Sequence, residues 1–469
     1  MLTANVICDK IIMYNVKKKG VCKMELNISD GARKIIRRIE ANGFSAYVAG
    51  GAVRDLIMGK IPHDYDIATN ARPGDIKKLF SKTIDTGIEH GTVTVVENKT
   101  GYEITTFRRD GEYNDSRHPE DVIYVNDPRT DCLRRDFTIN AMMYNPDSGL
   151  LDFFCGRRDI RQGIIRCVGN AEARFKEDAL RMLRAVRFKA QLGFAFEDKT
   201  AQAIKKCAVL IKKVSKERIR EELNKILLSD NPDAIRDLHE LGLLKFILPE
   251  LDRCFGEAQR NKYHIYDVGE HIMQAVKNTP RDLILRWSAL LHDTGKPCCS
   301  SVDAQGIIHF YGHHRESRRI AVDVLHRLHM DTVSIKEISL LVENHDYRVE
   351  ATFTAVKRMM SKTGAELFEK LLILQRADNM AKNPKHLPEK MRRINGGLDI
   401  FRQVLASKQP YRVSDLVING RDLMTLGYRQ GKEIGDALKM LLDEVIIKPE
   451  LNTRLYLMKR AKEIKGRLR

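Results

Sequence analysis

One stretch near the start of the chain constrains the fold more than any other. It opens with the apolar run Tyr47 to Ala49, which is typical of a buried strand. Gly50 and Gly51 follow and lead into a helical turn, and after it a second strand carries Asp64 and Asp66. Side chains two positions apart on a strand lie on the same face, so the two carboxylates should lie on one side of this strand.

These residue types favour a reaction on a phosphate group. Two oxygen ligands on one side of a strand suit Mg²⁺, so Asp64 and Asp66 are candidate metal ligands. Gly50 and Gly51 let backbone amides approach an anion, and a helix N-terminus after them favours negative charge. A lone glycine pair is usually a turn, and a lone Asp-x-Asp is usually a solvated loop. Their occurrence one short helix apart favours phosphoryl or nucleotidyl transfer.

The order Gly-Gly-x-Val-Arg-Asp followed by Asp-x-Asp resembles the head domain of class II tRNA nucleotidyltransferases and bacterial poly(A) polymerases. This family belongs to the polymerase-beta-like nucleotidyltransferases, so the resemblance implies an α+β head with a mixed sheet and helices. It implies that Asp64 and Asp66 are catalytic and hold Mg²⁺. It also implies that Gly50, Gly51 and Arg54 bind the nucleotide.

Two further segments of the head carry candidate residues. Glu103, on an expected strand from Tyr102 to Phe107, is a candidate third catalytic carboxylate, and an exposed strand glutamate is an equally good interpretation. The pattern Asp-x-x-Arg-Arg-Asp-x-x-x-Asn-Ala, which begins at Asp131, resembles the second motif of the family. That resemblance implies that Arg135 and Asp136 contact the ribose and phosphates, whereas a solvated helix face is the alternative.

A polar and charged run from residue 108 to 126 separates these two segments. A loop of this length is uncommon unless it is functional or disordered. The family has a flexible loop at this place that is required for adding the final A. After the second motif, we expect a hairpin from Asp152 to Gly169 to close the head.

The sequence Glu-Asp-x-x-Arg at residues 177–181 offers a way to choose a base. On a helix, Asp178 and Arg181 would lie three apart on one face. A carboxylate that accepts from an amino group, beside a guanidinium that donates to a ring nitrogen, fits cytosine and adenine but not uracil or guanine. An ordinary helical salt bridge is the alternative, but the pattern resembles the family's nucleotide-selecting motif. Arg187 does not share a face with Asp178, so Arg184 and Arg187 would hold the triphosphate or brace the neck.

A second candidate site lies further along the chain. Nine of the 14 histidines fall between His264 and His345, and imidazole with carboxylate is a normal ligand set for a divalent metal. A single one of them would be interpreted as a core histidine, but the order His…His-Asp…His…His…Asp resembles the HD metal-dependent phosphohydrolase domain. The resemblance implies four core ligands and two histidines for a second metal: His271, His292, Asp293 and Asp378, with His313 and His345. His314 is an alternative to its neighbour, and Mn²⁺, Ni²⁺ or Fe²⁺ would suit the set.

The charge balance indicates the kind of partner. A net charge of +18 over 469 residues predicts a polyanionic partner, nucleic acid before a membrane surface. No uninterrupted run of 18 apolar residues occurs, and Asp9 and Lys10 interrupt the only apolar stretch of the N-terminus, so we expect neither a transmembrane helix nor a signal peptide. The nine cysteines show no paired zinc spacing, and we expect reduced thiols in a cytoplasmic protein.

The sequence therefore predicts an α+β head followed by a mostly α-helical neck, body and tail. The expected regions are a disordered N-terminal extension (1–25), the head (26–169), a neck for nucleotide selection and RNA binding (170–230), a body (231–400) with the HD domain at about 262–380, and a tail that binds tRNA (401–469).

The resemblance covers nearly all of the chain from about residue 26 and implies template-independent addition of CCA to tRNA from CTP and ATP. A poly(A) polymerase, or an enzyme that adds only CC or only A, is the nearest alternative, and the loop at residues 108–126 argues against CC-only addition. An HD phosphohydrolase whose head only binds RNA is disfavoured by the intact Asp64 and Asp66. A non-catalytic RNA-binding protein is disfavoured by two complete metal sets.

Overall fold

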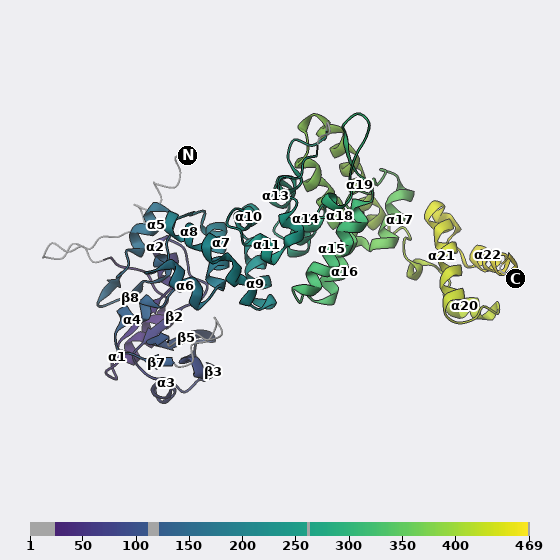
Figure 1. Ribbon diagram of the computed structural model, residues 1–469. Coiled ribbons are helices and arrows are strands. Elements are labelled where there is room, and N and C mark those ends of the chain that lie inside the picture. The colour runs from purple at the N-terminus through teal and green to yellow at the C-terminus, as the bar shows by residue number, and fades with distance from the viewer. Residues whose placement is uncertain (1–23, 111–121, 260–262, 468–469) are drawn as a thin grey trace. The chain divides into compact units, whose positions relative to one another are not determined.

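The computed structural model describes residues 24–110, 122–259 and 263–467, and the chain divides into two compact units (Figure 1). The first unit comprises residues 1–226 and 237–247, and the second comprises residues 227–236 and 248–469. The predicted α+β head followed by helices is confirmed. The finer region boundaries stay predictions, and residues 1–23 of the expected N-terminal extension lie outside the described residues.

The first unit is built on a seven-stranded sheet with the order β3-β4-β5-β2-β1-β8-β9. Its strands are β1 (Ala46–Ala49), β2 (Asp66–Thr69), β3 (Thr83–Gly87), β4 (Thr92–Glu97), β5 (Thr100–Thr106), β8 (Met143–Asn145) and β9 (Gly149–Leu151). β2 and β5 run parallel, and the other neighbouring strands run antiparallel. The parallel register sets Asp66 opposite Glu103, so two predicted site residues lie side by side.

Helices and short strands complete this unit. Those of the head are α1 (Asp30–Glu40), α2 (Gly51–Ile57), α3 (Pro73–Leu79), α4 (Pro128–Leu133) and α5 (Gly156–Gln162). The helices that follow are α6 (Ala171–Glu177), α7 (Leu180–Leu192), α8 (Asp198–Cys207), α9 (Lys216–Leu227), α10 (Ile235–Glu240) and α11 (Leu244–Ile247). Helix α1 shows why such a segment folds: Ser29 caps its first turn by accepting from the Ala32 amide, while Ile35, Ile36 and Ile39 are buried.

Two expectations for the head need correction. Asp64 is not on a strand: β2 begins at Asp66, because its pairing partner β1 ends where Gly50, at φ +69°, turns the chain away. Residues 152–169 form no hairpin, because the Asp152 carboxylate accepts the amides of Gly156 and Arg157 and so starts α5.

The short strand β10 (Ile164–Ile165) then pairs in parallel with β11 (Ala195–Phe196). The polar run at 108–126 begins and ends in strands β6 (Arg108–Asp110) and β7 (Val122–Tyr124), which pair antiparallel, and residues 111–121 lie outside the described residues.

The second unit is almost entirely helical. Its helices are α12 (Pro249–Asp252), α13 (Val268–Asn278), α14 (Leu283–Leu291), α15 (His313–Arg327), α16 (Thr332–Asn344), α17 (Phe353–Thr363), α18 (Ala365–Met380), α19 (Leu387–Ala406), α20 (Gly420–Thr425), α21 (Lys432–Ile447) and α22 (Arg454–Arg467). One hairpin, β12 (Ser300–Val302) with β13 (Ile308–Phe310), interrupts them. The fully buried Trp287 of α14 lies in the core, where α13, α14 and α18 contact one another.

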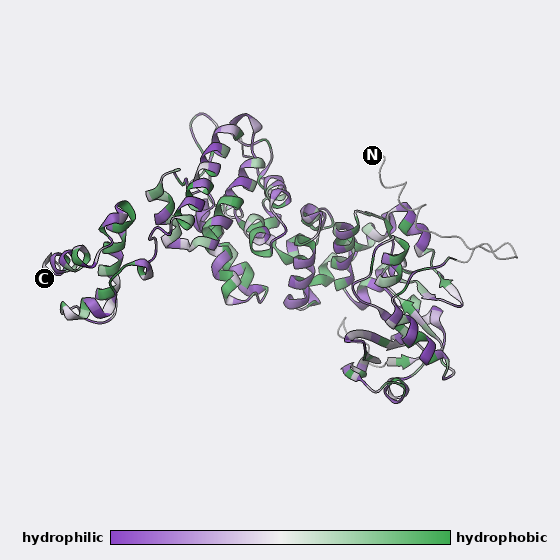
Figure 2. Ribbon diagram, turned by 180° about the vertical axis from the view of Figure 1, so that it is seen from behind, coloured by the Kyte–Doolittle hydropathy of each residue, from purple (hydrophilic) through white to green (hydrophobic). Residues whose placement is uncertain are grey.

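Hydrophobic and hydrophilic residues alternate around most helices of both units (Figure 2). Such a pattern buries one face of a helix and leaves the other in water. In the part of the chain that the structure describes, no helix has both the length and the apolar character needed to cross a membrane.

Candidate functional site

Three carboxylates gather at the ends of β2 and β5 in the head. Asp66 and Glu103 are register partners, and Asp64 lies in the bend just before β2. Desolvation by the surrounding protein, together with the charges of Asp66 and Asp64, raises the pKa of Glu103. The pKa of Asp66 is raised in the same way, although the nearby Arg135 guanidinium partly opposes the shift. Negative charge is therefore concentrated where a divalent cation would relieve it.

The fit of these carboxylates to a metal rests on donor chemistry, because their atoms are not drawn tightly together. Among the described residues, the groups of three or more ligand atoms within 4.8 Å of one another all lie in the second unit. Oxygen donors on neighbouring strands are nevertheless the type that Mg²⁺ prefers. Asp64, Asp66 and Glu103 are the residues of this head that would hold such an ion.

The glycine turn brings an arginine beside the carboxylates. Gly50 has φ +69°, and a Cβ there would lie only 2.8 Å from Arg135 Nη1 and 3.6 Å from Asp66 Oδ2. Arg135 Nη2 donates to Asp131 Oδ2 at 3.1 Å, which fixes the guanidinium next to Gly50. A larger residue at position 50 would therefore be strained and would displace Arg135 from Asp66.

A cluster of arginines lies around one aromatic ring of α7. The guanidinium carbons of Arg54, Arg184 and Arg187 lie 5.3, 5.6 and 4.4 Å from the centroid of the Phe188 ring. Burial lowers the pKa of Arg187, and the charges of Arg184 and Arg54 lower it further while Glu222 opposes them. Each guanidinium also has a carboxylate partner: Arg54 lies 2.7 Å from Asp55, Arg184 lies 2.6 Å from Asp136, and Arg187 lies 3.0 Å from Glu222. A polyanion such as a triphosphate would bind this cluster by exchanging with these partners.

Hydrogen bonds hold two of these arginines in place. Arg54 donates to Asn140 Oδ1 at 2.8 Å, and Asn140 donates onward to Asp136 Oδ1 at 3.2 Å. The buried Asp136 also accepts from Arg184 Nε at 2.7 Å. These bonds and the Arg184 charge outweigh desolvation and lower the pKa of Asp136 to about 2. The contact of Asp136 with nucleotide stays a prediction, and its carboxylate accepts hydrogen bonds from Arg184 and Asn140. Asn140 belongs to the second motif, whereas Phe188, which contacts all three arginines, was not singled out from the sequence.

The predicted placement of Asp178 and Arg181 on one helix face is wrong, whereas their role in base choice stays a prediction. Asp178 lies between α6 and α7 in an extended conformation, because its carboxylate accepts the Leu180 amide and starts the second helix. Its other oxygen accepts from Arg218 at 2.8 Å.

The Arg181 side chain instead donates to Glu177 at 2.7 Å and to backbone carbonyls, and only 8% of it is exposed. Each member of the expected pair therefore has a partner of its own.

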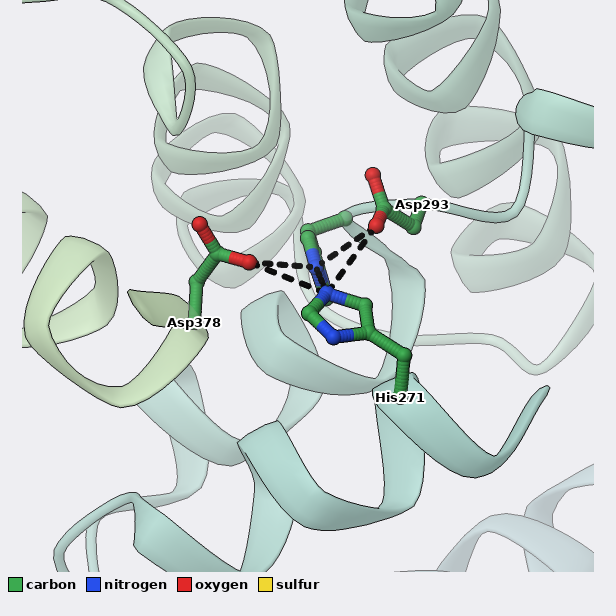
Figure 3. Close-up of side chains that lie close together, drawn as sticks. His271, Asp293 and Asp378 are labelled. Atoms are coloured by element: carbon green, nitrogen blue, oxygen red, sulfur yellow. Dashed lines mark hydrogen bonds and ion pairs between the residues drawn. The ribbon is translucent and has the colours of Figure 1, made fainter. Parts of the chain in front are cut away.

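The predicted histidines and aspartates of the second unit do come together. The ligand atoms of His271, His292, Asp293 and Asp378 lie within 4.8 Å of one another, and all four side chains are buried. Figure 3 shows the His271 ring facing both carboxylates, and its Nε2 lies 3.2 Å from Asp293 Oδ2 and 3.0 Å from Asp378 Oδ1. A second group, formed by Asp293 with His313 and His345, shares one carboxylate with the first. We call these residues the metal centre. The alternative His314 is not in either group.

The orientation of the four histidines is specific. In each ring Nδ1 faces a backbone carbonyl, of Ala381, Ala289, Phe310 and Val342 respectively for His271, His292, His313 and His345. A carbonyl only accepts, so each Nδ1 carries a hydrogen, and Nε2 is the ring atom that would lose its proton and bind a metal. The Nε2 atoms face one another at 3.3 Å in the first group and 3.4 Å in the second. Facing lone pairs are favourable when both bind a cation, so the donor set fits two divalent metals that share Asp293.

The buried carboxylates support the same conclusion. Both Asp293 oxygens and Asp378 Oδ1 are buried without a hydrogen bond of good geometry among the described residues. Burial alone would lower the pKa of His292, but the charges of Asp293 and Asp378 raise it to about 9, which marks a strongly negative environment. A buried lysine and a half-buried one lie beside these carboxylates: Lys296 Nζ is 2.6 Å from Asp293, and Lys382 Nζ is 2.5 Å from Asp378. Lys296 follows Asp293 by three residues and Lys382 follows Asp378 by four. These helical spacings were a sequence signal from which both lysines could have been assigned to the site.

Comparison with protein families finds three matches along the chain. Residues 46–166 match the poly(A) polymerase head domain, and residues 193–255 match a domain described as "Probable RNA and SrmB- binding site of polymerase A". Residues 308–461 match a second domain of tRNA nucleotidyltransferases.

Curated relatives match about half of the chain. A CCA-adding enzyme of Lactiplantibacillus plantarum is 52% identical over 203 residues, which are 43% of this chain and 50% of that protein. A CCA-adding enzyme of Limosilactobacillus reuteri is 47% identical over 220 residues, which are 47% of this chain and 55% of that protein. The chain thus spans about half the length of these relatives.

Solved structures match over a longer part of the chain. The CCA-adding enzyme of Bacillus stearothermophilus in complex with CTP is 28% identical, with a TM-score of 0.71 over 93% of this chain and 98% of that one. The Thermotoga maritima CCA-adding enzyme in complex with tRNA has a TM-score of 0.57 at 21% identity, covers 92% of this chain and 93% of that one, and shares the fold.

Proposed function

We propose that this chain, whose head and helical part match domains of tRNA nucleotidyltransferases and poly(A) polymerases, adds CCA to the 3′ end of tRNA from CTP and ATP without a template. The observation that carries this proposal is the parallel register of β2 and β5, which sets Asp66 beside Glu103 and next to Arg135. The arginine cluster around Phe188 supports it, because a triphosphate is the substrate group that such a cluster would favour.

In the proposed reaction the 3′ hydroxyl oxygen of tRNA attacks the α-phosphorus of the nucleotide. A new P–O bond forms, the bond between the α-phosphorus and the bridging oxygen breaks, pyrophosphate leaves with that electron pair, and the hydroxyl proton passes to solvent. Asp64 and Asp66 would hold Mg²⁺, with Glu103 as a third donor, and the ion when bound neutralises charge on the reacting phosphate.

The remaining residues would bind and orient the nucleotide. Arg54, Arg184 and Arg187 would bind its phosphates, and Arg135 would hold the ribose or a phosphate beside Asp66. These are the steps that the side chains of this head can supply by position and charge.

Base choice is proposed to involve Asp178 and Arg181, with an exchange of partners. The Asp178 carboxylate accepts from Arg218, and the amino group of cytosine or adenine would replace that donor. Uracil and guanine present an oxygen at that place, which cannot donate to a carboxylate. If Asp178 exchanged Arg218 for one of these bases, it would lose a hydrogen bond without gaining another. Arg181 is anchored by Glu177 and could donate to the ring nitrogen only after a similar exchange.

Recognition of tRNA is proposed to rest on shape and backbone. The net charge of +18 favours phosphate contacts, and the C-terminal helix α22 contributes exposed Lys and Arg. We propose a cytoplasmic location, which agrees with tRNA, CTP and ATP as substrates and with the expectation that the cysteines are reduced thiols. A poly(A) polymerase, or an enzyme that adds only CC or only A, is the alternative that product analysis distinguishes.

The proposal is tested by primer extension on tRNA that lacks its 3′ CCA. With CTP and ATP, the wild-type chain should extend it, and Asp66→Ala should not, while binding of tRNA is retained. Asp85→Ala is the matched control, because Asp85 is an exposed head carboxylate that forms an ion pair with Lys77. Equal extension by both variants would overturn the assignment of Asp66.

A second activity is supported by the metal centre. We propose that the helical unit contains an HD-type phosphohydrolase that uses a transition metal such as Mn²⁺, Ni²⁺ or Fe²⁺. Its substrates would be phosphomonoesters or 2′,3′-cyclic phosphates at damaged RNA ends. A water oxygen would bond to phosphorus, the P–O bond of the ester would break, and the alcohol would leave with the proton. The observation that carries this proposal is the set of four anchored histidines whose Nε2 atoms converge.

Separate variants distinguish the two activities. His292→Ala should abolish metal-dependent hydrolysis and spare CCA addition, because His292 lies in the second unit and the catalytic carboxylates lie in the first. His326→Ala, an exposed histidine of α15, should change neither. Hydrolysis that is absent with all three metals would refute the second proposal and leave the first intact.

A further inference from the structure

Two cavities open from the metal centre, and their linings differ. One has a volume of about 310 Å³ and the other of about 740 Å³. They share five lining residues: Tyr263, His264, His345, Asp346 and Lys382. A substrate bound at the metal centre can therefore extend in two directions within the same unit.

The smaller cavity is cationic. Besides Lys382 it is lined by Arg348, Lys390 and Arg393, the last two from α19. Lys390 and Arg393 are half-buried, and within the described residues none of these three makes an ion pair within 4 Å. The carboxylates that line this cavity are Asp346, Glu389 and Asp378, and Asp378 belongs to the metal centre.

The cations of this cavity lie close enough to repel one another. Burial lowers the pKa of Lys390, and the charge of Lys382 lowers it further. Burial also lowers the pKa of Arg393, with Arg348 as the next cause. The Lys390 Nζ atom lies 5.3 Å from the ring centroid of Tyr263, a residue that lines both cavities. A phosphate bound between Lys390 and Arg393 would relieve this repulsion.

The larger cavity is lined by apolar and aromatic side chains of the β12–β13 hairpin and the residue after it. Ile308, Phe310 and Tyr311 form part of its wall, with His309 between them. The Tyr311 ring is 76% exposed and stacks on His309 with ring centroids 5.2 Å apart and planes 8° from parallel. Flat exposed rings of this type stack on nucleobases.

We propose that the metal centre acts on the terminal phosphate of a nucleic-acid strand, whose end base stacks in the aromatic cavity while the adjoining phosphate binds Lys390 and Arg393. The inference rests on the hydrolase proposed above and adds the two subsites that would bind its nucleic-acid substrate. A small free phosphomonoester would need only the metals, Lys296 and Lys382. The cations of the smaller cavity would contribute to substrate binding when a second phosphate is covalently linked to the one being hydrolysed.

The proposal predicts a preference between two probes. Adenosine 3′-monophosphate carries the scissile group alone, and adenosine 3′,5′-bisphosphate adds a phosphate where the next nucleotide would be. We expect wild-type protein with Mn²⁺ to hydrolyse the 3′ group of the bisphosphate with a kcat/KM about 10–100-fold higher, the effect of about one charge-assisted contact. Lys390→Gln and Arg393→Gln should each remove most of this preference while changing the monophosphate rate less than about threefold.

Controls separate a phosphate subsite from a general loss of structure. Arg402→Gln replaces another arginine of α19, one that is largely exposed, and should keep the preference. Arg393→Lys should retain part of it, because the positive charge remains. If Arg393→Gln lowers both rates equally, or if the wild type shows no preference, the subsite is overturned.

A binding measurement keeps this inference distinct from the hydrolase itself. Calorimetry of adenosine 3′,5′-bisphosphate with the full chain should give a dissociation constant that rises about tenfold or more in Arg393→Gln. Binding that depends on Arg393 without any hydrolysis would support the subsite and refute the hydrolase. Hydrolysis without dependence on Arg393 or Lys390 would support the hydrolase and refute the subsite.

Discussion

The ring of Phe188 is predicted to organise nucleotide binding although it carries no charge. Three guanidinium groups lie 4.4–5.6 Å from its centroid, and they come from two helices, α2 and α7. A cation over an aromatic face gains about 0.5–1 kcal/mol, so three would gain about 1.5–3 kcal/mol. Phe188→Leu keeps an apolar side chain but removes the π face that holds the three arginines together. The nucleotide would then have to order these arginines itself, and the free energy of binding would be weaker by that amount. That corresponds to a loss of about 10–100-fold in nucleotide affinity.

Steady-state kinetics with CTP and with ATP tests this reasoning. Because the arginines bind phosphates in both the ground state and the transition state, KM should rise and kcat should change much less. Phe194→Leu is the matched control: Phe194 is a buried phenylalanine of the same unit, and no described cation lies over its ring. Phe194→Leu should cost about 1 kcal/mol of stability, and Phe188→Leu should cost more because the cation–π contacts are lost as well, so KM is compared only under conditions in which both variants are folded. If Phe188→Leu changes KM no more than Phe194→Leu does, the ring is only a packing residue.

Three further outcomes are expected. Asp178→Ala should weaken discrimination of C over U by about 1–3 kcal/mol, measured by sequencing the tRNA 3′ ends; unchanged selectivity would mean that Asp178 serves only the neck. Affinity for tRNA should fall linearly in log–log form as salt rises, and a flat response would exclude phosphate contacts as its source. The pKa of Asp136 falls from its ordinary 3.8 to about 2, so this carboxylate stabilises the fold by about 2.4 kcal/mol above about pH 4, and that contribution is lost as the pH falls to 2. Asp136→Asn should therefore reduce hydrogen-exchange protection of head amides at pH 6 but much less at pH 2, and an equal reduction at both would contradict the pKa.

The sequence alone predicted those features of the structure that depend on residues close together in the chain. The apolar run before Gly50 is β1, and the glycines lie at the turn into α2, because strand periodicity and positive φ are encoded within a few residues. The histidines and aspartates of the second unit were identified through their order, and the structure brings them together. The position of Glu103 beside Asp66 needed the parallel pairing of β2 with β5, which no local pattern specifies.

Contacts between distant segments account for what the sequence did not reveal. The break between α6 and α7 follows from the Asp178 cap, but its Arg218 partner lies 40 residues away. Arg54 reaches Phe188 only because α2 and α7 pack in the same unit. Likewise, the cationic cavity combines Arg348, which follows α16, with two residues of α19, so its charge could not be assigned before the fold was known.

The most direct test of the central claim is to identify the products that the chain forms when the nucleotides are supplied singly and then in succession. Given tRNA without its 3′ CCA, the wild-type chain with Mg²⁺ should add two C residues from CTP, should add a single A only after those, and should add nothing from UTP or GTP. The extended ends are read by sequencing. A long A tail from ATP alone, or incorporation by Asp66→Ala at a rate near wild type, would contradict the assignment of CCA addition to this head.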